Sequence, residues 1–155
     1  MTAAAATRLA RMSGSPATVA VAAVRDQPLD AVRVAGLVSD ERAGATVTFT
    51  GVVRNHDHGR AVTGIEYVGH PSADAVIAEI AAEFTGREGV HSIAVEHRIG
   101  TLAVGDLALV AAVSASHRAQ AFSTCSELVD RVKEKLPIWK RQLFTDGTAE
   151  WSNCP

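Results

Sequence analysis

The sequence predicts an α+β fold whose strands are mostly neighbours along the chain. Residues 45–54 alternate between two faces, as a half-buried strand does. Residues 107–114 form an almost continuous apolar run, which is typical of a central strand. Between residues 121 and 136, apolar side chains recur at helical spacing, which predicts one long amphipathic helix. Because sequential strands usually pair with each other, we expect mainly antiparallel pairing.

The first half of the chain contains three predicted strands and one short helix. A β-rich segment, Thr18 to Val24, is the first strand, and Pro28 opens a helix through Leu37 with the Asp30 carboxylate in its first turn. Gly44 is a break. The strand that follows places Val47, Phe49 and Gly51 on one face and Thr48, Thr50 and Val52 on the other. Asn55 to Arg60 is a loop by composition, and Val62 to Val68 is the third strand.

In the second half, a helix over Ser72 to Phe84 begins at Pro71 and precedes a strand over Val90 to Arg98. Residues 100–106 connect that strand to the apolar strand 107–114. Ser116 is the expected N-cap of the long helix. This helix ends near Lys135, because Pro137 disfavours the helical state of the residue before it.

Size and charge narrow the functional class. The chain has 155 residues, 47% of them hydrophobic, and a net charge of -2. We expect a flexible N-terminal tail over residues 1–16 and a single domain over residues 17–155. The charge argues against nucleic acid as the main partner, and no apolar run is long enough to span a membrane. The two cysteines form no disulfide framework, so we expect a protein of the reducing cytoplasm.

The cysteines and histidines give weak signals for metal or thiol chemistry. Cys125 falls on the apolar face of the long helix and is expected to be a core residue, whereas Cys154 is expected to be mobile. Neither belongs to a CxxC motif. His56 and His58 flank Asp57 in a glycine-containing loop without an evident third ligand, so we favour a solvated loop over a metal site.

Cations lie at both ends of the long helix. His117 and Arg118 stand at its start, where free backbone N–H groups favour an anion such as phosphate. Lys133 lies about 22 Å further along the helix. One small substrate can hardly contact both ends of the same helix. If both ends serve one site, the simplest arrangement is a homodimer in which each copy supplies one end.

Two interpretations of the terminal lysines remain open. Lys133 and Lys135 can both be last-turn lysines that complement the helix dipole. Alternatively, the turn after Pro137 folds Lys140 back towards Lys133, and each charge then lowers the pKa of the other lysine. A lysine tuned in this way can act as an acid, a base or a nucleophile near neutral pH. Trp139 is either a core anchor or a wall for an aromatic ligand.

Five motifs, taken in order, resemble the large, catalytic subunit of molybdopterin synthase. The resemblance covers about residues 18–151. The motifs are a strand FTGVVR with the loop NHDHG, a strand end EYVGHP, a hairpin HRIGTLAVGD, the segment SASHRAQAF followed by a helix and LPIWKR, and a terminal DGTAEW.

The resemblance implies a fold, a reaction and partners. The fold would be an α/β hammerhead with an additional antiparallel β subdomain. The reaction converts cyclic pyranopterin monophosphate into molybdopterin by building a dithiolene, and it needs no metal or cofactor. Sulfur comes from the thiocarboxylate at the C-terminus of a small ubiquitin-like subunit, whose tail inserts into the large subunit. Two large subunits form a central homodimer, with one small subunit at each end of the heterotetramer.

The resemblance also assigns site residues. The substrate-contacting positions correspond to Val52, Val53, Arg54, His117, Arg118, Lys133, Lys140, Arg141 and Gln142, with the His-Arg pair supplied by the opposite protomer. Arg54, Arg118 and His117 would bind the phosphate. Lys133 would be the principal acid/base residue, with Lys140 assisting. The family often has Glu where this chain has Gln142, which cannot act as a base, so we assign that position to binding.

Two other classes of function compete with this one. A non-catalytic scaffold could hold a ubiquitin-like partner by extending a sheet edge. A phosphate-ligand sensor would bind an anion without any protein tail. Paired lysines at a helix end argue against the scaffold, and binding of a Gly-Gly-terminated small subunit would argue against the sensor.

Overall fold

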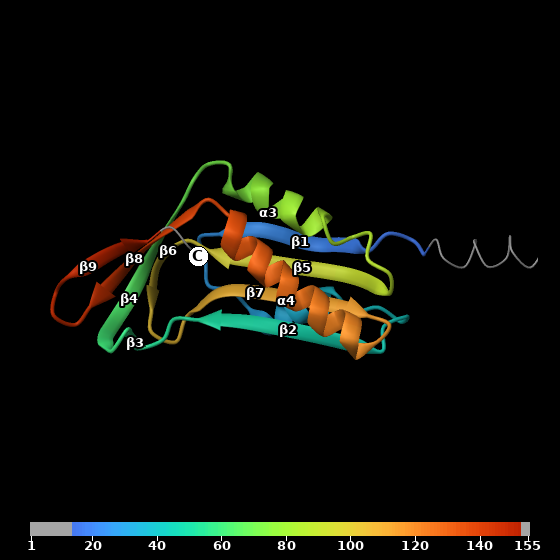
Figure 1. Cartoon of the computed structure of the whole chain (residues 1–155), viewed down its shortest axis with the longest axis horizontal. Coiled ribbons are helices and arrows are strands. Elements are labelled where there is room, and N and C mark those ends of the chain that lie inside the picture. The colour runs from blue at the N-terminus through green and yellow to red at the C-terminus, as the bar shows by residue number, and fades with distance from the viewer. Residues whose placement is uncertain (1–13, 153–155) are drawn as a thin grey trace, which may run out of the picture.

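The computed structural model describes residues 14–152 as a mixed arrangement of helices and two β-sheets. Figure 1 shows the larger sheet beneath two helices, with the smaller sheet at one end of the molecule. The elements in chain order are β1 (Thr18–Arg25), α2 (Ala31–Leu37), β2 (Ala45–Val52), β3 (His56–Asp57), β4 (Arg60–Gly69), α3 (Ala73–Ala82), β5 (Val90–Arg98), β6 (Gly100–Ala103), β7 (Leu107–Ala115), α4 (Arg118–Lys135), β8 (Ile138–Phe144) and β9 (Ala149–Ser152).

The larger sheet has the strand order β1-β5-β7-β2. The pairs β5–β7 and β7–β2 are antiparallel, as predicted. The pair β1–β5 is parallel, so the expectation of antiparallel pairing is wrong there. The chain leaves β1 and passes through α2, β2, β4 and α3 before it returns as β5, and a long crossover of this kind allows parallel pairing.

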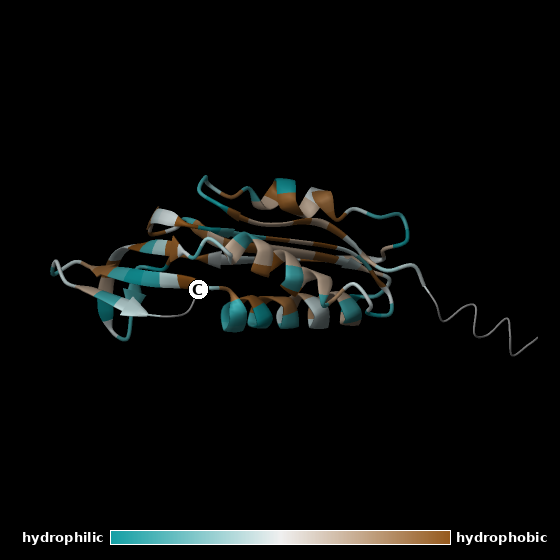
Figure 2. Ribbon diagram, turned by 90° about the horizontal axis from the view of Figure 1, so that it is seen from above, coloured by the Kyte–Doolittle hydropathy of each residue, from teal (hydrophilic) through white to brown (hydrophobic). Residues whose placement is uncertain are grey.

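Helices cover both faces of this sheet. In the two views at right angles, α3 and α4 lie on one face and α2 on the other (Figures 1 and 2). Strands β5 and β7 are buried almost throughout, because helices cover both of their faces. Strand β2 lies at the edge and keeps the predicted alternation, with Val47, Phe49 and Gly51 turned towards the core side.

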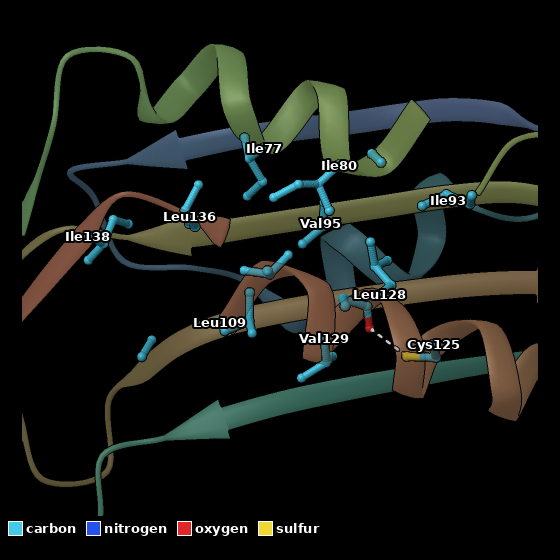
Figure 3. Packing of buried hydrophobic residues seen from close by; sticks show 14 of the residues in the cluster. Ile77, Ile80, Ile93, Val95, Leu109, Cys125, Leu128, Val129, Leu136 and Ile138 are labelled. Carbon is cyan, nitrogen blue, oxygen red and sulfur yellow. Dashed lines mark hydrogen bonds between the residues drawn. The ribbon is translucent and has the colours of Figure 1, made fainter. Parts of the chain in front are cut away.

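The main core lies between the sheet and the helices α3 and α4. Figure 3 shows Ile77 and Ile80 of α3 meeting Val95 of β5, while Leu128 of α4 packs beside them. Burying a large aliphatic side chain stabilises a fold by about 1.5–3 kcal/mol. The apolar stripe predicted for the long helix therefore anchors α4 from Ala121 to Val132, except at Phe122, which is exposed.

Cys125 is part of this core, which confirms its predicted role. Its Sγ lies 3.9 Å from the Ala111 carbonyl oxygen, and burial raises the pKa of its thiol to about 11 (Figure 3). A thiol that stays protonated at neutral pH is a poor nucleophile. Cys154 and nearly all of the tail predicted for residues 1–16 lie outside the described residues.

The C-terminal ends of α2 and α4 agree with the sequence analysis, and the helix predicted over residues 72–84 spans Ala73–Ala82. Helix α4 ends at Lys135, as predicted. The short helix α2 starts at Ala31 and not at Pro28. Asp30 is its N-cap, with Oδ1 accepting from the Arg33 N–H at 3.0 Å, so the carboxylate lies before the first turn and not within it. No helix within residues 14–152 is long and apolar enough to cross a membrane.

The smaller sheet has the order β3-β4-β8-β9, and β6 also pairs with β4, alongside Gly64 to Tyr67. Part of the predicted loop 55–60 forms the short strand β3, and part of the predicted connection 100–106 forms β6. The segment after Pro137, expected only to leave the helix, forms β8 along β4. Gly64 permits the close pairing of β6 with β4, because a Cβ there would lie 2.6 Å from the Leu102 carbonyl oxygen.

The two sheets meet where β2 ends and β8 begins. Backbone hydrogen bonds tie Val53 to the β6–β7 turn, from Val53 N–H to the Asp106 carbonyl at 3.0 Å and from Gly105 N–H to the Val53 carbonyl at 2.7 Å. Leu102 and Ile138 of the smaller sheet are buried in the same core as α4 and β5. This junction, next to the C-terminal end of α4, brings together several of the predicted site residues.

Candidate active site

Lys133 borders a small cavity at the junction between the sheets. The cavity measures about 90 Å³, and its lining includes Val52, Tyr67, His97, Leu109 and Lys133. These residues come from β2, β4, β5, β7 and α4 respectively. Complete small-molecule pockets usually measure about 300–1,000 Å³. The cavity therefore has room for one end of a substrate and not for a whole one.

Tyr67 and His97 form the buried wall of this cavity. Their rings meet edge to face, with centroids 5.1 Å apart and planes at 83°. His97 Nδ1 lies 2.8 Å from the Arg98 carbonyl oxygen. Burial lowers the pKa of His97 to about 4, and the charge of Lys133 adds to this effect. The imidazole is therefore uncharged at neutral pH.

Lys140 lies on the neighbouring β8 strand. It is the register partner of Tyr67, so the two side chains project from the same face of the smaller sheet. Gln142, two residues further along, lies on that face as well and is buried. Arg141 alternates to the opposite face, where its Nη1 lies 3.4 Å from Glu66 Oε2. The structure thus brings Lys140 and Gln142 to the Tyr67 side of the sheet and separates Arg141 from them.

Arg54 follows the end of β2 and is 67% exposed at its side chain. Its Nη2 lies 3.2 Å from Asp57 Oδ1, and His58 Nδ1 lies 3.2 Å from Asp57 Oδ2. Burial raises the pKa of Asp57, but its contacts with His58, Lys140 and Arg54 together hold this pKa below its usual value. Asp57 therefore pairs with Arg54 and also lies within the electrostatic influence of Lys140.

The two valines before Arg54 occupy different environments. Val52 is 51% exposed and reaches the cavity of Lys133, whereas the Val53 side chain is buried. The register of β2 against β7 shifts between Gly51 and Val52. Such irregularities redirect side chains near functional sites.

His117 and Arg118 lie at the opposite end of α4, where both are exposed. The sequence analysis expected Ser116 as the N-cap, but the N-cap is His117. The Ser116 hydroxyl instead lies 2.8 Å from His91 Nε2, and Gln120 Oε1 accepts from the His117 N–H at 3.2 Å. The Ser116 hydroxyl thus bonds to His91 of β5 and does not cap the helix, and His117 takes the N-cap position.

This helix start is held firmly. Gln120 Nε2 donates to the Glu88 carbonyl at 3.1 Å, and the Ser116 N–H donates to the Gly89 carbonyl at 2.7 Å. Gly44 packs against the same turn, where a Cβ would lie 2.5 Å from the Ser116 carbonyl oxygen. These contacts fix the backbone that carries His117 and Arg118.

Within one chain, the predicted site residues therefore fall into two groups. Lys133, Lys140, Arg54, Val52 and Gln142 surround the junction between the sheets. His117 and Arg118 lie about 22 Å from Lys133, at the other end of α4. Among residues 14–152, no three His, Cys, Asp or Glu side chains cluster as metal ligands.

Three residues of this site were missed by the sequence analysis. His97 and Tyr67 received no role in the sequence analysis, and Asp57 was assigned to a solvated loop. Alternation within the segment that became β4 could have placed Tyr67 on an inward face. No sequence signal pairs it with His97, because that contact joins two strands of different sheets.

A groove runs beside α4 from Phe122, in the second turn of the helix, to Lys133. It measures about 520 Å³ and lies between α4 and the edge strand β2. Its lining is largely apolar and includes Val47, Phe49, Phe122 and Val129. Phe122, in the second turn of α4, is 62% exposed, so this member of the predicted apolar stripe lies outside the core.

Comparisons with known proteins agree with this arrangement. The model of the MoaE protein family matches residues 24–135. The chain is 34% identical over 131 residues to the molybdopterin synthase catalytic subunit of Nostoc sp., covering 83% of this chain and 79% of the relative. It is 38% identical over 110 residues to that of Thermoplasma volcanium, covering 70% and 80%.

Solved structures show the same fold. The molybdopterin synthase structure from Staphylococcus aureus matches with a TM-score of 0.78 and 31% identity, covering 84% of this chain and 96% of that one. A complex of subunits 1 and 2 of the molybdopterin-converting factor from Helicobacter pylori contains a chain that matches with a TM-score of 0.67. That chain is 18% identical, with 84% and 88% covered, and supports the fold alone. From the family match and these relatives, the chain belongs to the MoaE family.

Proposed function

We propose that this chain is the catalytic subunit of a molybdopterin synthase and acts as a sulfurtransferase in the cytoplasm. It would transfer sulfur from the C-terminal thiocarboxylate of a small ubiquitin-like subunit to cyclic pyranopterin monophosphate. The product is the dithiolene of molybdopterin. The observation that carries this proposal is the position of Lys133. It borders a small cavity that is also lined by Tyr67, the register partner of Lys140 on β8.

The cations of the site suit the charges of the substrates. The substrate phosphate and the thiocarboxylate are both anionic, and charge-assisted hydrogen bonds to Arg or Lys are stronger than neutral ones. Arg54 lies at the open side of the junction and is suited to the phosphate. Lys133, at the cavity, is suited to exchange a proton with the reacting group while the cyclic ester opens. Lys140 would assist, and Gln142 would bind through its amide.

The size of the cavity supports a partner tail. A volume of about 90 Å³ suits a narrow terminal group, such as the thiocarboxylate at the end of an extended chain. The Helicobacter pylori structure that shares this fold is a complex of two subunits. A dithiolene contains two sulfur atoms and each tail carries one, so two small subunits would be consumed for each product.

The site would be completed by a second copy of this chain. If Arg118 of one copy reaches Lys133 of its partner, two-fold symmetry requires the reverse contact as well. The two α4 helices would then run antiparallel, and the axis would pass near Cys125 and Ser126, midway between the two cations. The apolar groove and the exposed Phe122 lie on this stretch, which supports it as the contact surface.

The same family membership supports a finer description of the fold. We infer that the helix-covered sheet corresponds to the α/β hammerhead of the family. The sheet formed by β4, β6, β8 and β9 would be the additional antiparallel β subdomain. The chain would then form the centre of a heterotetramer, with one small subunit at each end. The division into residues 1–16 and 17–155 remains a prediction.

A reconstitution tests the proposal. The purified chain is mixed with a thiocarboxylated small subunit and cyclic pyranopterin monophosphate, and the dithiolene product is detected by fluorescence after oxidation. We expect product with the thiocarboxylated subunit and none with the same subunit carrying an ordinary carboxylate. Formation of the complex without product would favour the scaffold. Binding of the phosphate without any complex would favour the sensor.

A further inference from the structure

A buried tyrosine lies between the two lysines assigned to the reaction. Tyr67 lines the same cavity as Lys133 and pairs in register with Lys140. Its side chain is 7% exposed, and a buried tyrosine hydroxyl usually has a hydrogen-bond partner. Apart from His97, the other strand residues that line the cavity, such as Val52, Ala108 and Leu109, have no polar side-chain atoms.

His97 holds the tyrosine ring in place. The Arg98 carbonyl can only accept a hydrogen bond, so its contact at 2.8 Å assigns the imidazole proton to Nδ1. The imidazole then stands edge to face against the Tyr67 ring at 5.1 Å. Both rings are buried, so the phenol has little freedom to turn away from the cavity.

We propose that Tyr67 is a positioning residue for sulfur transfer, whose phenol oxygen accepts a hydrogen bond from the Lys133 ammonium and holds it at the cavity. His97 supports this role by fixing the phenol ring. The inference rests on the proposed function, because Lys133 is assigned there as the acid/base residue.

The chemistry of the substrates favours a phenol in this position. A lysine side chain has large rotamer freedom, and a fixed partner reduces the number of positions that its ammonium samples. A carboxylate would hold the ammonium more strongly, but its charge would repel an anionic tail. An uncharged phenol orients the lysine and leaves its positive charge available to the substrate.

The substitution Tyr67→Phe tests this role, because it removes one oxygen and keeps the ring. We expect kcat to fall about 10- to 100-fold, as for the loss of one hydrogen bond to a charged group. KM for both substrates should stay within about twofold, because positioning acts on the reaction step and not on binding. A Tyr67→Phe variant with the kcat of the wild type would overturn the proposal.

A matched control removes a hydroxyl from the same strand. Thr63 lies on β4, and its Oγ1 donates to the Leu143 carbonyl at 3.3 Å, away from the cavity. Thr63→Val should keep the wild-type kcat. His97→Gln provides a second variant, because it removes the ring edge but retains a side-chain donor. It should lower kcat less than Tyr67→Phe does.

A second readout does not depend on sulfur transfer. Lys133 and Lys135 share the last turn of α4, and only Lys133 lines the cavity. Their rates of modification by an amine-reactive reagent can be compared by mass spectrometry. Tyr67→Phe should raise the ratio of Lys133 to Lys135 labelling several-fold. An unchanged ratio would overturn the inference, whereas an inactive wild type would overturn the proposed function alone.

Discussion

The Asp57 carboxylate lies 3.2 Å from the Arg54 guanidinium, at the edge of the proposed substrate site. Lys140 acts on the same carboxylate electrostatically. An anionic substrate that binds Arg54 and Lys140 must therefore compete with an internal carboxylate. The Arg54–Asp57 pair lies next to the turn formed by His58 and Gly59, which both have positive φ values of 47° and 77°. This tight turn fixes the carboxylate close to the cations.

Removing the charge of Asp57 should strengthen the binding of an anionic substrate. We expect Asp57→Asn to lower KM for the pterin phosphate by about two- to fivefold, the range of an exposed ion pair. The control is Asp146→Asn, which removes the same charge from a carboxylate paired with Arg60 in the β8–β9 hairpin. If both variants lower KM equally, the effect comes from net charge and not from the Arg54 site.

The burial of His97 should make stability depend on pH. The pKa of His97 is about 4 in the folded chain and 6.5 in the unfolded reference, so the unfolded chain binds the proton first as pH falls. The contribution of the neutral His97 to the unfolding free energy is complete above pH 6.5 and is lost progressively as pH falls from 6.5 to 4. The titration of His97 alone should therefore lower the unfolding free energy by about 2 kcal/mol when the pH falls from 7 to 5.

Urea unfolding at the two pH values measures this dependence. The matched variant is His97→Gln, which does not titrate in this range. Its loss of unfolding free energy between pH 7 and pH 5 should be smaller than that of the wild type by the amount assigned to His97. Equal losses in both proteins would show that His97 is not the group responsible.

A buried carboxylate joins the first strand and the first helix to the centre of the sheet. Glu96 on β5 is fully buried, and its oxygens lie 2.9 Å from Arg25 Nη2 and 2.6 Å from Arg33 Nη2. Glu96→Gln should lower the unfolding free energy by about 1.5–3 kcal/mol, because it removes the negative charge from the hydrogen bonds to two half-exposed guanidinium groups. The exposed pair of Asp40 and Arg42 provides the control. Thermal melts of Asp40→Asn should stay close to the wild type, and an equally small change in Glu96→Gln would contradict this account.

Mixed dimers test whether the site is shared between two copies. Lys133→Ala and Arg118→Ala chains should each be inactive as homodimers. After subunit exchange at equal concentrations, half of the dimers contain one chain of each kind, and each such dimer has one intact site. Activity should then recover to about a quarter of the wild type. A mixture that remains inactive after confirmed exchange would place both residues in the site of a single chain.

Much of the fold follows from local patterns in the sequence. Periodicity predicted the strands that became β1, β2, β5 and β7, and it predicted the end of α4 at Lys135. These elements carry long apolar patterns whose spacing matches one type of secondary structure. The parallel pairing of β1 with β5 was not predicted, because it depends on how distant segments pack and not on either strand alone.

The smaller sheet was harder to predict for a physical reason. Strand β8 interrupts its apolar pattern with Lys140 and Gln142, which face the proposed site and not a hydrophobic core. Functional residues thus weakened the alternation that marks a strand. By contrast, the position of Lys133 at a helix end was clear from the sequence. Its neighbours Tyr67 and His97 come from other strands and required the structure.

The central claim is that Lys133 performs the chemistry of sulfur transfer. The most direct measurement is a single-turnover assay of dithiolene formation by Lys133→Ala and Lys135→Ala, each with the thiocarboxylated small subunit bound. The two variants remove the same charge from the same helical turn, and only Lys133 lines the cavity. We predict that Lys133→Ala forms the complex with almost no product, whereas Lys135→Ala retains the wild-type rate. Full activity in Lys133→Ala would contradict the account.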